Sequence, residues 1–145
     1  MQKENFDKYL KERYFDQLNW YDKKAAENQR KYKVLQGLII ILSAITPIAI
    51  LAGGIFNSFA VFTSTLVAIF TSIIGAFKYH ENWVSYRTTC ETLKKEYYYY
   101  QMKANAYKIA SDPETLFVDR VEEVISRENT LWVNTQTYEK KKGGR

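Results

Sequence analysis

The sequence predicts an all-α membrane protein: a two-transmembrane helical hairpin with long cytoplasmic helical extensions and a C-terminal cytoplasmic helix, assembled as a homo-oligomer. Three observations predict this class. From Val34 to Phe77 the chain contains no Asp, Glu, Lys, Arg or His. Charged residues fill the segments on both sides of this stretch. Within those segments the apolar residues recur at helical spacing. Since domains typically hold ~100 to 200 residues, we treat residues 1–145 as a single domain.

The N-terminal segment, residues 4–33, is predicted to form a cytoplasmic amphipathic helix. It contains no Gly or Pro, and its apolar side chains return every three or four residues. These are Phe6, Leu10, Tyr14, Leu18, Tyr21 and Ala25. Because nothing breaks the pattern before Val34, we expect one helix to run from the cytosol into the membrane.

The uncharged stretch has room for two membrane crossings, because each crossing of a ~30 Å hydrocarbon core needs about 20 apolar residues. We assign them to residues 34–52 and 59–77, joined by a short external loop over residues 53–58. Gly53 and Gly54 give this loop its backbone freedom. A soluble protein that buries the hairpin is the alternative, but the remaining polar segments are too short to cover two such helices.

Residues 78–110 are predicted to form a second cytoplasmic helix that leaves the membrane with at most a bend at the interface. Its apolar residues alternate at steps of four and three, the spacing of a coiled-coil seam: Tyr79, Trp83, Tyr86, Cys90, Leu93, Tyr97, Tyr100, Ala104 and Tyr107. Such a seam needs a partner, and the helix over residues 4–33 is the nearest. Asp112 and Pro113 end this segment and begin a C-terminal cytoplasmic helix over residues 113–135. Residues 140–145 are predicted to be a disordered tail.

Basic residues next to the spans set the orientation, because Lys and Arg resist translocation. Arg30, Lys31 and Lys33 precede the first span, Lys78 and Arg87 follow the second, and the connecting loop is uncharged. Both termini are therefore expected to be cytoplasmic. We expect no signal peptide, because no short apolar region begins near Met1.

The composition argues against an enzyme and against a metal site. Cys90 and His80 are the only residues of their kinds, so neither an intrachain disulfide nor a zinc site built from several Cys or His is available. We find no glycine-rich phosphate loop, no nucleophile paired with a histidine and no cofactor motif. The net charge of +5 suits both anionic lipid and a nucleotide or nucleic-acid ligand.

Small and weakly polar residues line one side of the second span at steps of four and three. They allow two readings: close helix packing between copies, or the wall of a water-filled path. Both readings require neighbouring subunits, and the spans contain no ionisable residue that would serve a proton relay. The pore-lining candidates are Ser64, Ala68, Thr71, Ser72 and Gly75.

Two further sets of candidates follow the second span. The first, at the membrane exit, combines interfacial anchors with residues placed to transmit a gating movement: Lys78, His80, Trp83, Tyr86 and Arg87. The second set lies farther along the helix over residues 78–110. Its lysines allow two interpretations, a solvated face or phosphate binding, and its tyrosines also allow two, helix packing or stacking on a base. These ligand-binding candidates are Arg87, Lys94, Lys95, Tyr97 and Tyr100.

In the order and spacing of these features the chain resembles the SLATT family of two-transmembrane proteins. The likeness covers YLKERYFDQLNWYDKKAAENQRKY before the first span, the hairpin, FKYHENWVSYRTTCETLKKEYYYY after the second and FVDRVEEVISRENTLWVNTQ near the end. Residues at expected family positions are Trp20, Tyr21, Ala25, Asn28, Tyr32, His80, Trp83, Tyr86, Arg87, Leu93, Glu96, Phe117, Glu128 and Trp132. Cys90 stands where we expect a small residue such as Ala.

The resemblance implies a pore-forming effector in the inner membrane of a bacterium, acting in anti-phage defence. Such a protein is controlled from the cytoplasm by a nucleotide or oligonucleotide second messenger, made by a cognate nucleotidyltransferase, or by a sensor protein. Because two helices cannot enclose a conduit alone, we expect a symmetric ring and take four subunits as the working number. Membrane lipid and further copies of the chain are then its partners, and no duplex DNA is expected. The alternative is a non-conducting membrane scaffold that recruits a sensor or an enzyme.

Overall fold

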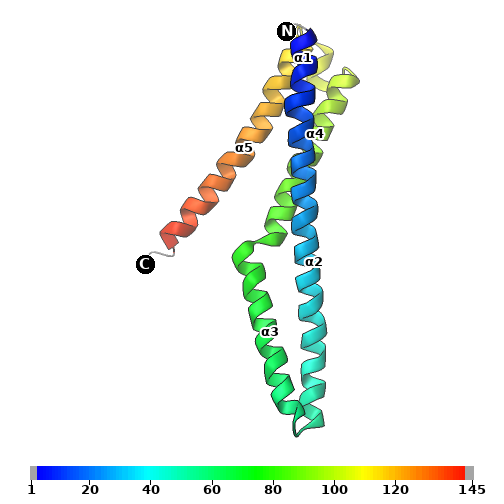
Figure 1. Ribbon diagram of the computed structural model, residues 1–145. Coiled ribbons are helices and arrows are strands. Elements are labelled where there is room, and N and C mark those ends of the chain that lie inside the picture. The colour runs from blue at the N-terminus through cyan, green and yellow to red at the C-terminus, as the bar shows by residue number, and fades with distance from the viewer. Residues whose placement is uncertain (1–2, 143–145) are drawn as a thin grey trace. The chain divides into compact units, whose positions relative to one another are not determined.

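The computed structural model describes residues 3–142, with the side chains of residues 3–128 and 130, and this part of the chain is helical with no strand (Figure 1). Its elements in order are α1 Lys3–Tyr9, the π-helix η1 Leu10–Tyr14, α2 Phe15–Ala52, α3 Phe56–Phe77, α4 Tyr79–Gln101, the 3₁₀ helix η2 Asn105–Lys108 and α5 Pro113–Lys142. The chain divides into two compact units. We call residues 24–84 the hairpin unit, and residues 1–23 with 85–145 the head unit.

In the hairpin unit the uncharged stretch forms two helices, α2 and α3, joined by a tight turn (Figure 1). Gly53 and Gly54 make this turn with φ of 69° and 57°, a conformation that costs glycine little. As the sequence predicts, α2 continues without interruption through Val34 into the apolar stretch. Both helices are long and apolar enough to cross a membrane. Their outward side chains are largely hydrocarbon, for example Ile48 and Val61.

The return segment differs from the unbroken helix that the sequence predicts. Lys78 adopts the left-handed conformation, with φ of 48°, and separates α3 from α4. Its backbone N–H still donates to the Ile74 carbonyl at 3.0 Å, and the Asn82 side chain caps the end of α3 by donating to the Phe77 carbonyl at 3.1 Å. A non-glycine residue in this conformation is strained, and no Gly or Pro in the sequence marks the break.

The head unit is built around an aromatic core. Phe117 of α5 packs against the rings of Phe6, Tyr14 and Tyr100, at centroid distances between 5.2 and 5.8 Å. The fully buried members of the core come from every helix of the unit: Phe6, Tyr14, Tyr21, Cys90, Leu93, Tyr107, Phe117, Val121 and Ile125. Cys90, Leu93 and Tyr107 belong to the predicted seam, which therefore faces α1, η1 and the start of α2 as expected.

The predicted helix over residues 78–110 ends early, because α4 stops at Gln101. Lys103 and Asn105 have φ of 47° and 53°, and the chain then forms η2 before α5. At the start of α5 the Asp112 carboxylate accepts a hydrogen bond from the Thr115 backbone N–H at 3.1 Å. Helix α5 extends to Lys142, so residues 140–142 of the predicted tail are helical. Residues 143–145 lie outside the described residues.

Candidate functional site

Small side chains hold the two helices of the hairpin together. Ala49 of α2 and Ala60 and Thr63 of α3 are buried between them. The hydroxyl groups of Thr46 and Thr63 lie 2.9 Å apart and form a hydrogen bond across the hairpin. Close packing of small residues with an occasional polar bond is how helices associate in lipid, so the packing within the hairpin suits a bilayer.

The five pore-lining candidates lie on the surface of α3. Ser64, Ala68, Thr71, Ser72 and Gly75 are all exposed, whereas Ala60 and Thr63 of the same helix are buried against α2. The structure therefore keeps the predicted stripe together and leaves it open to neighbouring molecules.

The hydroxyl groups of this stripe are already hydrogen-bonded within α3. Ser64 donates to the Ala60 carbonyl at 2.9 Å, Thr71 to the Val67 carbonyl at 2.8 Å, and Ser72 to the Ala68 carbonyl at 2.8 Å. Each hydroxyl oxygen keeps a lone pair that accepts a further hydrogen bond. The stripe is thus compatible with lipid, and it still offers acceptors to water or to another subunit.

A groove of about 660 Å³ lies beside this stripe near the turn of the hairpin. Its walls come from α3 and the end of α2: Ile50, Asn57, Ala60, Val61, Ser64, Thr65 and Ala68. Ser64 and Ala68 are the two predicted residues among them. Small side chains at this spacing let another helix approach closely.

The gating candidates divide between the two units. In the hairpin unit His80 lies 5.0 Å from the Tyr32 ring of α2 and 5.7 Å from the Trp83 ring, and the Lys33 ammonium lies 6.0 Å over Trp83. With the break at Lys78, these residues form an aromatic junction between α2 and the start of α4. Such stacked and cation–π contacts stabilise a definite geometry there.

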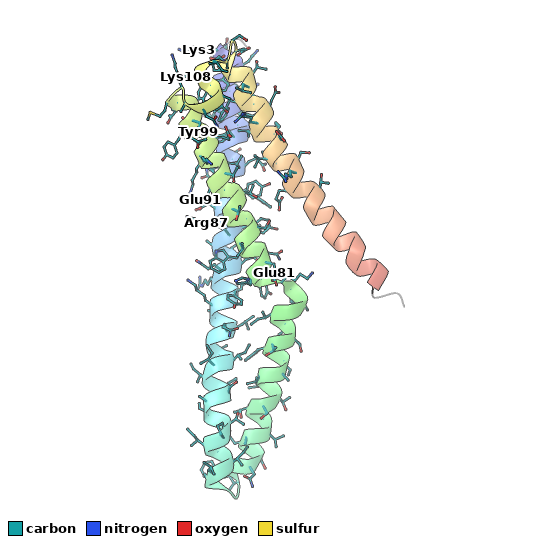
Figure 2. All side chains as sticks on the ribbon, turned by 180° about the vertical axis from the view of Figure 1, so that it is seen from behind. Lys3, Glu81, Arg87, Glu91, Tyr99 and Lys108 are labelled. Carbon is teal, nitrogen blue, oxygen red and sulfur yellow. The ribbon has the colours of Figure 1, made fainter. Side chains whose placement is uncertain are left out.

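Tyr86 and Arg87 belong to the head unit. The Tyr86 ring lies 5.6 Å from Trp20 and 6.2 Å from Tyr21. Figure 2 shows Arg87 and Glu91 one helical turn apart on α4, where their side chains form an ion pair at 2.8 Å. These two gating candidates therefore serve the packing of the head unit.

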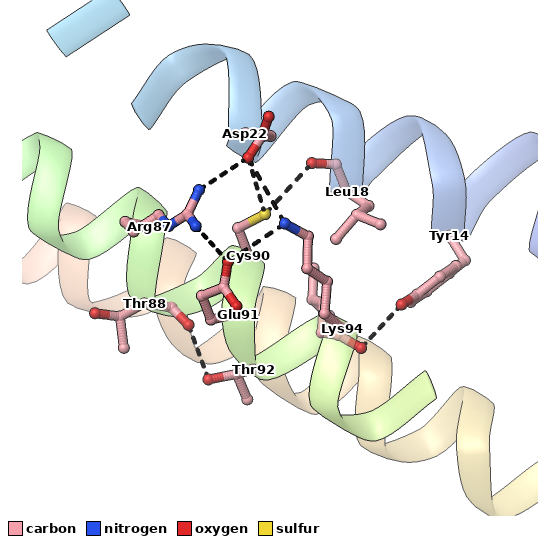
Figure 3. A network of polar contacts seen from close by, with 10 residues as sticks. Tyr14, Leu18, Asp22, Arg87, Thr88, Cys90, Glu91, Thr92 and Lys94 are labelled. Carbon is pink, nitrogen blue, oxygen red and sulfur yellow. Dashed lines mark hydrogen bonds and ion pairs between the residues drawn. The ribbon is translucent and has the colours of Figure 1, made fainter. Parts of the chain in front are cut away.

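Two of the ligand-binding candidates belong to a surface charge network (Figure 3). The Asp22 carboxylate accepts from Arg87 at 3.2 Å and lies 3.8 Å from the Lys94 ammonium. Glu91 pairs with Lys94 at 3.3 Å. Two carboxylates thus balance the two basic groups, and the charges that a ligand phosphate would need are already engaged.

The tyrosines of this set are partly buried and pack against the aromatic core. Tyr97 stacks on Tyr14 at 5.3 Å, and Tyr100 lies 5.2 Å from Phe117. Lys95 lies 5.4 Å over the ring of Tyr99. The structure therefore does not bring the five ligand-binding candidates together around one open pocket.

No local sequence pattern predicts the two polar clusters that join α5 to the rest of the head unit. Glu122 accepts from Tyr9 at 2.9 Å and from two nitrogens of Arg13, each at 3.1 Å. Arg13 holds the pKa of Glu122 below its usual value. Glu96 accepts from Tyr107 at 2.9 Å and from Arg120 at 3.2 Å. Partners this far apart in the sequence leave no local signal.

A second groove, of about 350 Å³, separates α4 from α5 in the head unit. Its walls are rich in hydroxyl groups: Ser85, Thr88, Thr89, Thr92, Val124, Arg127 and Glu128. The spacing of the first four residues is the signal that was available in the sequence. Burial raises the pKa of Glu128, which accepts a hydrogen bond from Tyr21 at 3.3 Å. Among the described residues no group of His, Cys, Asp or Glu is placed to hold a metal ion.

Fold and site define an all-helical protein with two helices long enough and apolar enough to span a membrane. The chain belongs to the family described as "Protein of unknown function (DUF4231)", whose model matches residues 16–115. The match contains the whole hairpin unit and α4. Searches among curated proteins and among solved structures found no match.

Proposed function

We propose that the protein is a pore-forming membrane effector of a bacterial anti-phage defence system. In this proposal several copies form an ion channel in the inner membrane, with both termini cytoplasmic. A nucleotide second messenger or a partner protein gates the channel from the cytoplasm. The defence role rests on the resemblance to the SLATT family, while the pore rests on the hairpin.

The observation that carries the pore is the exposure of the polar stripe on α3. Ser64, Thr71 and Ser72 are exposed in the hairpin unit, so a ring of hairpins has hydroxyl groups to turn toward its axis. Their free lone pairs would solvate a passing ion or its water. Exposed hydrocarbon on the remaining surface, including Phe62 and Ile69, would face lipid. Four subunits remain the working number.

The junction at Lys78 supports control from the cytoplasm. A continuous helix would transmit a rotation of α4 to α3 as a rigid rod. The break at Lys78 instead concentrates bending between the two helices at one residue. His80 and Trp83 lie on α4 immediately beyond it and contact α2. A ligand that binds one arrangement of the cytoplasmic helices more tightly than another would shift the population of open pores.

Conductance of the purified oligomer in planar bilayers, with and without candidate nucleotides, tests the proposal. The double variant Thr71→Leu with Ser72→Leu should reduce conductance strongly, because leucine replaces two hydroxyls with bulk and hydrocarbon. The matched control is Phe62→Leu with Ile69→Leu, which changes two exposed residues of α3 outside the stripe. Oligomers that never conduct, or equal conductance of the stripe variant and the wild type, would contradict the pore.

The internal hydrogen bonds of the stripe favour a second candidate, the non-conducting scaffold. Because each hydroxyl already bonds a carbonyl four residues earlier, the stripe does not require water. A scaffold would recruit a sensor or an enzyme through its arms. Expression of the Thr71→Leu, Ser72→Leu variant in growing cells distinguishes the scaffold from the pore. A scaffold should tolerate the two substitutions, whereas a pore should lose its toxicity or change its ion leakage.

A further inference from the structure

A second cavity in the hairpin unit lies where the uncharged stretch begins, and its volume is about 660 Å³. Val34, Leu35 and Ile73 form its apolar wall, at the cytoplasmic end of both spans in the proposed topology. Arg30, Lys31, Glu27 and Tyr79 complete the lining. One cavity thus combines a hydrocarbon wall with a basic rim, at the depth where lipid headgroups meet acyl chains.

No carboxylate among the described side chains pairs with the basic groups of this rim. Arg30 is exposed, and its side chain makes no ion pair or hydrogen bond with the side chains that the structure describes, those of residues 3–128 and 130. The Lys31 ammonium lies 5.7 Å over the Tyr79 ring, so its neighbour is an aromatic face. Glu27, the acidic residue of the lining, pairs with Lys24 at 3.2 Å. The rim therefore carries uncompensated positive charge, unlike the network around Arg87.

We propose that this cavity binds one anionic phospholipid, with the headgroup phosphate on Arg30 and Lys31 and an acyl chain along Val34, Leu35 and Ile73. The guanidinium group offers paired donors that match phosphate oxygens. The ammonium adds charge, and the Tyr79 hydroxyl sits at the level where tyrosine prefers the membrane interface. The proposal rests on the membrane insertion in the proposed function and adds a specific lipid to it.

The apolar wall selects lipid over a soluble phosphate. Val34, Leu35 and Ile73 offer no hydrogen bond to a ribose or a base, whereas an acyl chain gains from contact with them. These residues belong to the spans themselves, Val34 and Leu35 to α2 and Ile73 to α3. A phospholipid can therefore enter the cavity sideways from the bilayer without leaving the hydrocarbon region.

The test uses the full chain in nanodiscs of phosphatidylcholine with increasing phosphatidylglycerol, and native mass spectrometry to measure retained lipid. The wild type should retain phosphatidylglycerol selectively. Arg30→Gln with Lys31→Gln should weaken that retention by roughly 25-fold, because each basic group near anionic lipid is worth about a fivefold change. The matched control is Lys23→Gln with Lys33→Gln, which removes the same charge from the same helix outside the cavity and should retain the lipid.

Equal loss in the control and cavity variants would overturn the site and leave only general surface attraction. Displacement of the lipid by adenosine monophosphate or inorganic phosphate, added at the same concentration as the competing lipid, would overturn the choice of lipid in favour of a soluble phosphate. A protein that conducts but shows no preference for phosphatidylglycerol would overturn this site alone. A chain that carbonate extracts from the nanodisc membrane would overturn the proposed function together with the site.

Discussion

The hydroxyl groups of Thr46 and Thr63 form a 2.9 Å hydrogen bond between the two apolar helices. Thr63 is 1% exposed, and its hydroxyl also donates to the Ala60 carbonyl at 3.0 Å. This polar contact within a hydrocarbon interface fixes which face of α3 meets α2. The polar stripe consequently stays exposed beside this contact.

Replacing Thr63 with valine should loosen the hairpin while keeping its shape, because valine has nearly the same volume and lacks the hydroxyl. Interhelical hydrogen bonds of this kind are worth about 0.6 kcal/mol on average and at most about 1.7 kcal/mol. The free energy of unfolding in mixed detergent micelles, followed by circular dichroism, measures the loss. Thr65→Val is the control, because Thr65 is exposed and bonds only the Val61 carbonyl of its own helix. An equal loss in both variants would argue against the interhelical bond.

The hairpin and the main packing face of the head unit could be predicted from the sequence. An uncharged stretch of this length leaves few alternatives, and the spacing of Cys90, Leu93 and Tyr107 requires one buried side. The spacing of Ser64, Thr71 and Ser72 likewise predicts a common face of one helix. It does not predict where that face points, since this depends on the contact of Thr63 with α2.

The backbone irregularities could not be predicted. Lys78 takes a conformation that lysine rarely adopts, and neither glycine nor proline stands at the break, since the nearby Gly75 lies within α3. Helix α4 ends at Gln101, although its composition would allow it to continue. Contacts far apart in the chain, such as those of Glu96 with Tyr107 and Arg120, accompany this ending and are invisible to local patterns.

The partly buried Glu96 carboxylate should be important for the stability of the head unit. It is 15% exposed and accepts hydrogen bonds from Tyr107 and Arg120. Glu96→Ala leaves both donors without their acceptor, so we expect a loss of about 2 to 4 kcal/mol, as for a buried pair that loses one member. Glu91→Ala is the control. It breaks only exposed ion pairs, each worth at most about 1 kcal/mol. Thermal unfolding of the two variants under the same conditions gives the comparison.

Buried tyrosines should make the head unit unstable at high pH. Burial is the largest cause that raises the pKa of Tyr14, Tyr21 and Tyr107 above the ordinary value of 10.0. A group with a raised pKa in the folded state stabilises the fold fully below its unfolded pKa, and this contribution is lost as the pH rises toward the folded pKa. Stability should therefore fall above about pH 10.

The alkaline transition can be followed by tyrosinate absorbance and circular dichroism on the same sample. The buried tyrosines should ionise together with the loss of helix, because the folded state holds their protons. Tyr14→Phe should make the fall of stability with pH less steep, since one proton fewer is released on unfolding. Complete ionisation of all tyrosines while the helical signal stays intact would contradict the prediction.

Cys90 should react with alkylating reagents only when the head unit opens. Its side chain is 0% exposed, and its thiol lies 3.9 Å from the Leu18 carbonyl and 3.7 Å from the Asp22 carboxylate. Burial raises the pKa of the thiol, which further depletes the reactive thiolate. Because Cys90 is the only cysteine, the rate of iodoacetamide labelling of the whole chain reports opening at this one position. Labelling should be slow in the native protein and should accelerate in Glu96→Ala, whose weakened core opens more often. Rapid labelling of the native protein, at the rate of the unfolded chain, would show that α4 does not pack against α2 at Leu18 and Asp22.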